Sequence, residues 1–525
     1  MLVGCALLTV APLWAVKHLP FTDLPEHVAT MATLAHWFDP SWPDSRIYTL
    51  TGTATPYLAY HLAGALLARL TGDALMANRI ILTAVGIAMP YATRELLRAF
   101  GGDERLALFG CTAFWCRPLV IGFLPFLAAV PVTLYVVALA QRQREVPTRR
   151  RAWGLAALTV LVFYLHLDPF LLIVGVTLVI HLVPRVGDTE DLEDRIDRVP
   201  ARVAWLVPGL LAAALWLLRA RAAAAFLGDG PVSFLSADQL AVEFPAWSSG
   251  IWRSRFEIVS GTVSWALLLA LAWRGRSPEP GGARGLTVRL VPFACALVLF
   301  ALLPFQVGVT RMLNVRFAVL LLPTLLVAVR PDPGRVTAAV LTAVVLVTAG
   351  VAGHAFVQMR AAERGEIAGL DDLLAQVTPG ARLLSLQFDR DSRFATFPPW
   401  TKVGALHRLR GGGVASVSFA EVPHWPIHYR PESHPPGGAG RDLEWHPCAF
   451  RNSVDGPYFD YVLTRGAIDP FRYAPAGPAW KLLGRAVQQD GPAWSLFEKV
   501  GSDGVTAAGN AAATDPGPCA SPLFR

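Results

Sequence analysis

The stretch HLPFTDLPEHVAT, His18 to Thr30, follows directly on the first apolar segment of the chain. It brings two carboxylates and two histidines within ten residues of a predicted membrane edge. One interpretation is structural: Asp23 caps a short helix that begins near Leu24, Pro25 fits its first turn, and Glu26 completes a capping box. The other is functional, because an acid fixed at a helix start at headgroup depth can serve a lipid-borne substrate as general base or as ligand of a divalent cation. The two interpretations are compatible.

The composition is that of a polytopic α-helical membrane protein. Of 525 residues, 54% are hydrophobic and 16% are charged, which leaves too little polar surface to cover a water-soluble domain. The net charge of +7 is typical of basic cytoplasmic loops that face anionic lipid. We therefore expect membrane lipid as a partner and no nucleic acid.

Apolar runs predict about eleven transmembrane helices within residues 1–357. Several runs are shorter than the roughly 20 residues that cross a bilayer, so their bounds are approximate. The predicted spans are Met1–Val16, Ala74–Phe100, Leu106–Cys116, Val120–Ala140, Trp153–Leu167, Phe170–Val183, Val203–Leu218, Ile258–Trp273, Leu290–Leu303, Ala318–Val329 and Val336–Val357.

Lysine and arginine in short loops favour the cytoplasmic side and so predict the orientation. The chain has four basic segments, at Arg94–Arg105, Gln141–Arg151, Arg274–Arg289 and Arg330–Arg335. All four lie inside only if Thr55–Leu70 is an interfacial helix rather than a span, so that residues 17–73 form one long outer loop. The N-terminus is then inside, and everything after Val357 is outside.

The chain changes character from Gln358 onward. Proline and glycine become more frequent, and strand-like segments occur at RLLSLQF, YFDYVLTRG and AWSLFEKV. This predicts a small extracytoplasmic α/β domain over residues 358–500. Residues 501–525 are rich in Gly, Ala and Pro and predict a disordered tail. Of six scattered cysteines only Cys448 and Cys519 lie outside the apolar region, so a disulfide between them is an open alternative.

An acid in the first outer loop, interfacial helices after it and a many-helix body with an outer C-terminal domain resemble the GT-C glycosyltransferase superfamily. Protein O-mannosyltransferases, oligosaccharyltransferases and lipid A aminoarabinose transferases share this plan. More narrowly, TDLPEH resembles the Asp-x-Pro-x-His stretch near the N-terminus of a group of bacterial membrane proteins with GT-C-like architecture. The resemblance extends to about Val357 and implies a location in the bacterial inner membrane.

The resemblance also implies roles for the residues that open the chain's outer loop. Asp23 matches the acid that acts in the superfamily as base or metal-associated carboxylate while an acceptor attacks a sugar on a polyprenyl phosphate carrier. His27 lies four residues on, on the same helical face, and Glu26 is the third catalytic candidate. Many members carry a second acid in the next outer loop, but Phe114–Phe123 offers Arg117, a substrate-binding candidate, and no carboxylate. A divalent cation is therefore left open as a cofactor, with Asp23 as its candidate ligand.

Other ionisable residues near the outer face are candidates for substrate binding, because such groups are costly at membrane depth and usually face a cavity or a partner. His166 and Asp168, in YLHLDPF, lie at a turn between two spans, and a purely structural turn is the alternative. Arg311 and Arg316, in GVTRMLNVRF, suit contact with a donor phosphate, with snorkelling to lipid headgroups as the alternative. His61, in the interfacial helix, fits a structural role more readily.

The leading hypothesis is an integral membrane glycosyltransferase that transfers a sugar from a polyprenyl-phosphate-linked donor to an extracytoplasmic glycan, lipid or protein. Two alternatives stay open. A non-catalytic assembly factor for envelope glycans keeps the fold but does not need Asp23. A transporter should show two matching halves with Gly- or Pro-broken helices, and the sequence shows no such symmetry, although Pro90 and Pro131 interrupt predicted spans.

Overall fold

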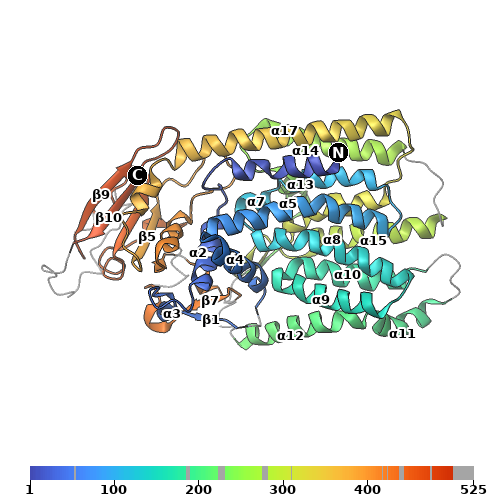
Figure 1. Ribbon diagram of the computed structural model, residues 1–525, viewed down its shortest axis with the longest axis horizontal. Coiled ribbons are helices and arrows are strands. Elements are labelled where there is room, and N and C mark those ends of the chain that lie inside the picture. The colour runs from blue at the N-terminus through green and yellow to red at the C-terminus, as the bar shows by residue number, and fades with distance from the viewer. Residues whose placement is uncertain are drawn as a thin grey trace.

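The computed structural model describes the whole chain except residues 53–54, 185–189, 223–230, 275–281, 309, 417, 423, 437–442, 473–475 and 501–525. The predicted disordered tail and Cys519 therefore lie outside the described residues. Cys448 is disulfide-bonded. The molecule is elongated, with a bundle of helices at one end and a sheet-containing tail domain at the other (Figure 1).

The bundle is built from helices of very different lengths. Its helices are α1 (Leu2–Val10), α5 (Ala74–Ala99), α6 (Phe109–Thr112), α7 (Arg117–Ile121), α8 (Leu124–Glu145), α9 (Arg149–Leu165), α10 (Leu167–Leu182), α11 (Leu192–Arg202), α12 (Val207–Ala222), α13 (Ala237–Ser249), α14 (Arg255–Arg274), α15 (Gly282–Leu302), α16 (Ala318–Leu325) and α17 (Arg335–Glu366). Between them lie the 3-10 helices η1 (Ala11–Trp14), η2 (Glu104–Leu108), η3 (Ala204–Leu206), η4 (Val315–Phe317) and η5 (Leu326–Ala328), and a small sheet of β2 (Val232–Ser233), β3 (Gln306–Val307) and β4 (Thr310–Arg311).

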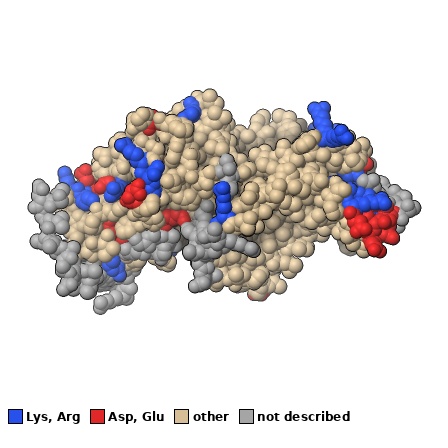
Figure 2. Space-filling model, turned by 90° about the horizontal axis from the view of Figure 1, so that it is seen from below, with Lys and Arg blue, Asp and Glu red and all other residues tan. Residues whose placement is uncertain are grey.

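The bundle is that of an integral membrane protein. Among the described residues, α5, α8, α14, α15 and α17 are long and apolar enough to cross a membrane, and the bent pair of α11 and the helix after it is a sixth candidate. On the face shown in Figure 2, most charged residues gather toward the two ends of the molecule, and the broad band between them carries few. Regular helices occupy the residue ranges of all the predicted spans except one. The number of eleven transmembrane helices stays a prediction.

The exception is Leu106–Cys116, where the prediction of a regular helix is wrong. This segment consists of η2, the four-residue α6 and a turn, and Leu106 to Cys111 are buried. It still runs the length of the bundle, because α5 and α8 are parallel: an ion pair of 2.6 Å between Arg142 and Glu95 joins their C-terminal ends. Irregular backbone at membrane depth is tolerated where protein surrounds it, and hydropathy cannot distinguish that case from a lipid-facing helix.

The basic residues Arg142 and Arg330 lie at the end of the bundle away from the tail domain. Arg142 meets the end of α5, and Arg330 donates a hydrogen bond of 3.1 Å to the carbonyl of Phe100. From this end α17 runs the length of the bundle and enters the tail domain (Figure 1). It continues past the predicted boundary at residue 357 to Glu366, whose buried carboxylate accepts hydrogen bonds from Trp400 and Ser392.

The outer loop over residues 17–73 is folded and joined to the tail domain. It contains α2 (Leu24–Ala35), α3 (Asp44–Ile47), β1 (Tyr48–Leu50) and α4 (Leu58–Thr71), and α4 occupies the predicted interfacial helix. Strand β1 pairs antiparallel with β7 (Ile427–Tyr429) of the tail domain. The tail domain therefore packs on the outer loop as a single unit with it.

The tail domain is an α/β structure built on a mixed five-stranded sheet of order β6-β5-β8-β10-β9. Strands β5, β8 and β10 confirm the three predicted strand segments, and β5 is parallel to β6 and β8. The elements are α18 (Leu370–Leu374), β5 (Arg382–Gln387), η6 (Val403–Arg410), β6 (Val414–Ala415), η7 (Phe419–Glu421), η8 (Pro431–Ser433), η10 (Pro447–Ala449), β8 (Tyr461–Arg465), β9 (Trp480–Ala486) and β10 (Trp494–Lys499).

Candidate functional site

Asp23 lies at the N-terminal end of α2, as predicted, but it does not cap the helix. Its side chain makes no capping hydrogen bond, and its backbone N–H donates to the carbonyl of Ile121 at 3.0 Å. The Glu26 side chain is directed to the tail domain, where the Ser418 hydroxyl donates to it at 2.8 Å. The capping-box interpretation is therefore wrong, and the Asp23 carboxylate is left for another role.

The Asp23 backbone is held between two distant segments. The Thr22 hydroxyl donates to the carbonyl of Pro398 in the tail domain at 2.7 Å, and the Thr22 N–H donates to Val120 at 2.9 Å. Gly122 has a left-handed φ of 93° and its Cα lies against Asp23. The acid thus lies where the bundle, the outer loop and the tail domain meet.

Burial and the charges around Asp23 bring the pKa of its carboxyl toward neutral pH. Burial raises the pKa of Asp23 to about 7, and the carboxylates of Glu444 and Glu26 add to the rise. The cations of Lys402 and Arg316 act in the opposite direction. A group with a pKa near the working pH is suited to accept and release a proton in catalysis.

Lys402 comes from the tail domain and was not predicted from the sequence. Its Nζ lies 3.2 Å from Glu444 Oε2, with 8% and 4% of the two side chains exposed, and 4.0 Å from the centre of the Phe419 ring. Burial alone would lower the pKa of Lys402, but Glu444, Asp23 and Glu26 outweigh it and raise that pKa. Lys402 is therefore a buried cation whose charge acts on the Asp23 carboxyl.

Glu26 belongs to the contact between α2 and the tail domain. Its carboxylate lies 4.0 Å from the guanidinium of the buried Arg408, which lies 4.0 Å from Asp44 on its other side. Arg408 also donates to the hydroxyl of Thr33 at 2.7 Å. Glu26 thus helps to join the outer loop to η6, and its catalytic role stays a prediction that this arrangement does not favour.

His27 and His61 meet in the space between α2 and α4. Nδ1 of His27 lies 3.0 Å from Nε2 of His61, and Nε2 of His27 lies 3.0 Å from the carbonyl oxygen of Gly122. Nδ1 of His61 lies 2.8 Å from the carbonyl oxygen of Tyr57. Tyr57 has a φ of 73°, which is strained for a residue other than glycine, and its hydroxyl lies 3.0 Å from His166 Nε2.

His166, Asp168 and Arg316 form a second cluster. His166 Nδ1 accepts the N–H of Asp168 at the start of α10, which confirms the turn that the sequence predicted. Arg316 lies 3.1 Å from both His166 Nε2 and the Asp168 carboxylate, and its guanidinium lies 4.0 Å from the Phe123 ring centre. The buried Nε of Arg316 has no hydrogen-bond partner among the described residues.

Arg311 and Arg117 lie apart from these clusters. The Arg311 side chain is exposed, and only its carbonyl takes part, as acceptor from Arg316. Arg117 forms an ion pair of 3.1 Å with Glu243 and lies over the Trp247 ring. The structure therefore brings His27 to His61 and Arg316 to His166 and Asp168, and the charge of Arg316 acts on Asp23. The exposed Arg311 side chain takes no part in either cluster.

The residues around Asp23 do not fit a divalent cation. In the described part of the chain, no group of three or more His, Cys, Asp or Glu side chains is placed to hold a metal ion. The buried Lys402 charge already acts on Asp23 and disfavours a second cation beside it. We derive no step through a metal.

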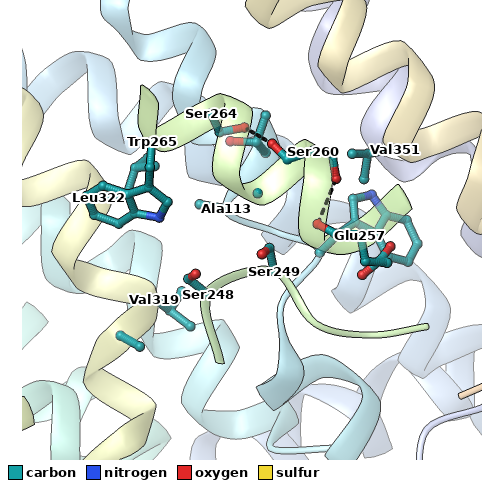
Figure 3. Close-up of a pocket in the computed structure, with 14 residues that line it drawn as sticks. Ala113, Ser248, Ser249, Glu257, Ser260, Ser264, Trp265, Val319, Leu322 and Val351 are labelled. Atoms are coloured by element: carbon teal, nitrogen blue, oxygen red, sulfur yellow. Dashed lines mark hydrogen bonds between the residues drawn. The ribbon is translucent and has the colours of Figure 1, made fainter. Parts of the chain in front are cut away.

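A cavity of about 500 Å³, including its open part, lies elsewhere in the bundle (Figure 3). Its lining combines apolar side chains such as Trp265 and Leu322 with serine hydroxyls, and Ser260 and Ser264 donate their protons to helix carbonyls. None of the predicted site residues lines it. No motif in the sequence predicted this cavity, and it is separate from the Asp23 cluster.

The chain matches no family model and no curated protein sequence. A solved structure, that of ArnT from Cupriavidus metallidurans bound to undecaprenyl phosphate, resembles it with a TM-score of 0.55 over 94% of this chain and 97% of that chain, at 14% identity. The fold is that of the GT-C membrane glycosyltransferases. The GT-C protein arabinofuranosyltransferase AftD from Mycobacteria, in a mutant form, is similar with a TM-score of 0.50 and 17% identity over 95% of this chain and 41% of that chain. At these identities the likeness shows the shared GT-C fold alone.

Proposed function

We propose that this protein transfers a sugar from a polyprenyl-phosphate-linked donor to an extracytoplasmic glycan, lipid or protein. The observation that carries the proposal is Asp23: a partly exposed acid, free of capping bonds, whose pKa lies near 7, at the junction of a GT-C bundle with its tail domain. The structural neighbour ArnT was solved bound to undecaprenyl phosphate, which supports a lipid phosphate as the donor's carrier.

The reaction that fits the site is a displacement at the anomeric carbon. An acceptor hydroxyl attacks this carbon while Asp23 takes its proton, and a new glycosidic bond forms. The bond from the sugar to phosphate breaks, and polyprenyl phosphate leaves with the electron pair. Lys402, which favours ionised Asp23, keeps the base ready to accept the proton.

Arg316 is the proposed contact for the donor phosphate. Its guanidinium is fixed by Asp168, His166 and the Phe123 ring, and its Nε–H is left without a partner among the described residues. A guanidinium held in this way can donate to a phosphate oxygen with little loss of side-chain entropy. The exposed Arg311 is the weaker choice.

The topology belongs to the same proposal. Asp23 and the tail domain lie at the end opposite the basic residues Arg142 and Arg330, which under the positive-inside rule supports an outer location for them at a bacterial inner membrane, with the N-terminus inside. The segment 104–123 runs back between the parallel helices α5 and α8, which supports one crossing without a regular helix in the proposed total of eleven.

Purified, detergent-solubilised protein with a polyprenyl-phosphate-linked sugar tests the proposal. Asp23→Asn should lower donor consumption by about 10²–10⁴-fold, the usual contribution of a positioned base. Asp39→Asn is the matched control, because Asp39 follows α2 in the same loop but bonds only locally, to Ser41 and His36. Unchanged turnover in Asp23→Asn would remove Asp23 as the base, and no donor consumption by the wild type would favour a non-catalytic assembly factor or a transporter.

A further inference from the structure

His27 and His61 form the middle of a continuous chain of short contacts between two backbone carbonyl groups. It runs from the Gly122 oxygen to His27 Nε2 at 3.0 Å, from His27 Nδ1 to His61 Nε2 at 3.0 Å, and from His61 Nδ1 to the Tyr57 oxygen at 2.8 Å. All three separations are within hydrogen-bond range. A ring flip of His61 would remove two of the three contacts, so the observed ring orientation is the one that bonds.

This chain of contacts needs more N–H protons than two neutral imidazole rings carry. A carbonyl oxygen accepts and never donates, so the nitrogen facing Gly122 and the nitrogen facing Tyr57 must both carry hydrogen. A third proton is required between His27 and His61, because two lone pairs would otherwise face each other at 3.0 Å. Two neutral imidazoles supply two N–H groups in total, one fewer than the contacts require.

Burial and Lys402 disfavour a positive charge on the His27–His61 pair, and the aromatic rings around the pair favour one. Burial lowers the pKa of each ring taken alone, to about 4 for His61, and Lys402 acts on His27 in the same direction. Aromatic rings surround the pair: the Trp425 ring centre lies 5.1 Å from that of His27 and 4.6 Å from that of His61, and the Tyr60 ring centre lies 5.6 Å from both. Nearby aromatic rings can favour a cation. The ionisable groups on the elements packed against the pair are Asp23 and Glu26 on α2, Tyr57 and Tyr60 on α4, and Lys402 and His424 in the tail domain.

We infer that His27 and His61 share one extra proton in the folded protein and act as a singly charged positioning pair for Asp23, a role that rests on the proposed function. His27 lies one helical turn after Asp23, and the Gly122 carbonyl that it binds belongs to the residue packed against Asp23. The pair thus links α2, α4 and the segment 120–122 around the carboxylate. Loss of the extra proton removes the hydrogen bond between His27 Nδ1 and His61 Nε2.

The pH dependence of stability tests the shared proton, because the two protonation states predict different behaviour above about pH 6.5. A folded pair that shares one extra proton binds one, whereas two unfolded histidines bind two well below pH 6.5 and none well above it, so the stabilisation is greatest near pH 6.5 and is lost as pH rises further. If both rings are neutral, the stabilisation is present above about pH 6.5 and is lost as pH falls. We expect the Tm advantage of the wild type over His61→Gln to shrink between pH 6 and pH 9. An advantage that stays constant or grows between pH 7 and pH 9 would overturn the inference.

His434→Gln is the matched control, because His434 is exposed and its ring nitrogen bonds, among the described residues, to the carbonyl of its neighbour Pro435. Its Tm should follow the wild type across the range. A second measurement uses the wild type alone, in case His61→Gln does not fold. Nitrogen-15 NMR of labelled histidine at pH 7 should show an imidazolium signal that survives at pH 8, where exposed histidines are neutral; only neutral signals would overturn the inference.

Turnover separates positioning from stability. If the proposed transfer is correct, His61→Gln should lower kcat by about 10²-fold, the cost of a misplaced catalytic group, with KM for the donor unchanged. An unchanged kcat would remove the positioning role. The Tm and NMR measurements use no sugar donor, so their outcome is independent of the proposed function.

Discussion

Gly122 lies directly against Asp23, so closely that a Cβ on Gly122 would come 2.6 Å from the Asp23 backbone nitrogen. The contact explains how the irregular segment after residue 104 and the start of α2 share two backbone hydrogen bonds, from Thr22 and Asp23 to Val120 and Ile121. The position of the acid therefore depends on a glycine that is distant from it in the sequence.

Gly122→Ala should displace Asp23 and lower both stability and turnover. The side chain would collide with backbone rather than with a flexible group, and the φ of 93° adds strain, so we expect a loss of about 2–4 kcal/mol. Gly72→Ala is the control. Its φ of 74° is similarly left-handed, but a Cβ added at Gly72 would meet no described atom within 4 Å. Denaturant titrations should show the larger loss at position 122, and equal losses would mean that the contact with Asp23 is unimportant.

The pH profile of turnover should report the ionisation of Asp23. Because burial raises the pKa of Asp23 to about 7, activity that needs the carboxylate should rise with pH through about 7 and be lost at pH 5. Lys402 favours the ionised form, so Lys402→Met should move this limb to higher pH. Glu444 disfavours it, so Glu444→Gln should move the limb to lower pH.

Lys481→Met is the control for these two variants. Lys481 is exposed on β9 and is not among the groups that shift the pKa of Asp23. The measurement is kcat/KM for the donor between pH 5 and pH 9. Shifts in the same direction for Lys402→Met and Glu444→Gln would show that the limb does not report Asp23.

The sequence was informative where local pattern determines the outcome. Hydropathy located the helices of the bundle, and the position of Asp23 after the first apolar segment is what made it the leading candidate for the site. Hydropathy failed at Leu106–Cys116 because a segment buried among helices is as apolar as one that faces lipid.

The partners of the site residues are set by packing between segments far apart in the sequence, which the sequence alone could not predict. The capping box at Glu26 is plausible locally, yet the partners of Glu26 are Ser418 and Arg408 in the tail domain. Lys402 has no neighbouring charge pattern that marks it, and it meets Asp23 only because the tail domain packs on the outer loop. Contacts across nearly four hundred residues have no signal in spacing or periodicity.

The buried network around Arg408 should be a main source of stability for the junction. Arg408→Met leaves the carboxylates of Glu26 and Asp44 buried without their shared cation, which costs about 3–5 kcal/mol. Arg410→Met, on the exposed end of the same η6, should change stability by less than about 0.5 kcal/mol. Chemical denaturation of both variants measures the difference, and a small effect at Arg408 would show that the junction is stabilised by its apolar contacts instead.

The two arginines of the donor site should respond differently to the same conservative change. Arg316→Lys removes the planar fork that Asp168, His166 and the Phe123 ring hold in place, so a phosphate contact worth about 1.5–3 kcal/mol should be lost. This corresponds to a rise of about 10- to 100-fold in KM for the polyprenyl-phosphate-linked donor. Arg311→Lys should leave KM unchanged, because the Arg311 side chain is exposed and only its backbone carbonyl contacts Arg316, which any residue supplies. Steady-state kinetics of the two variants decide between them, and a larger effect at Arg311 would move the proposed phosphate contact from the fixed guanidinium to the exposed one.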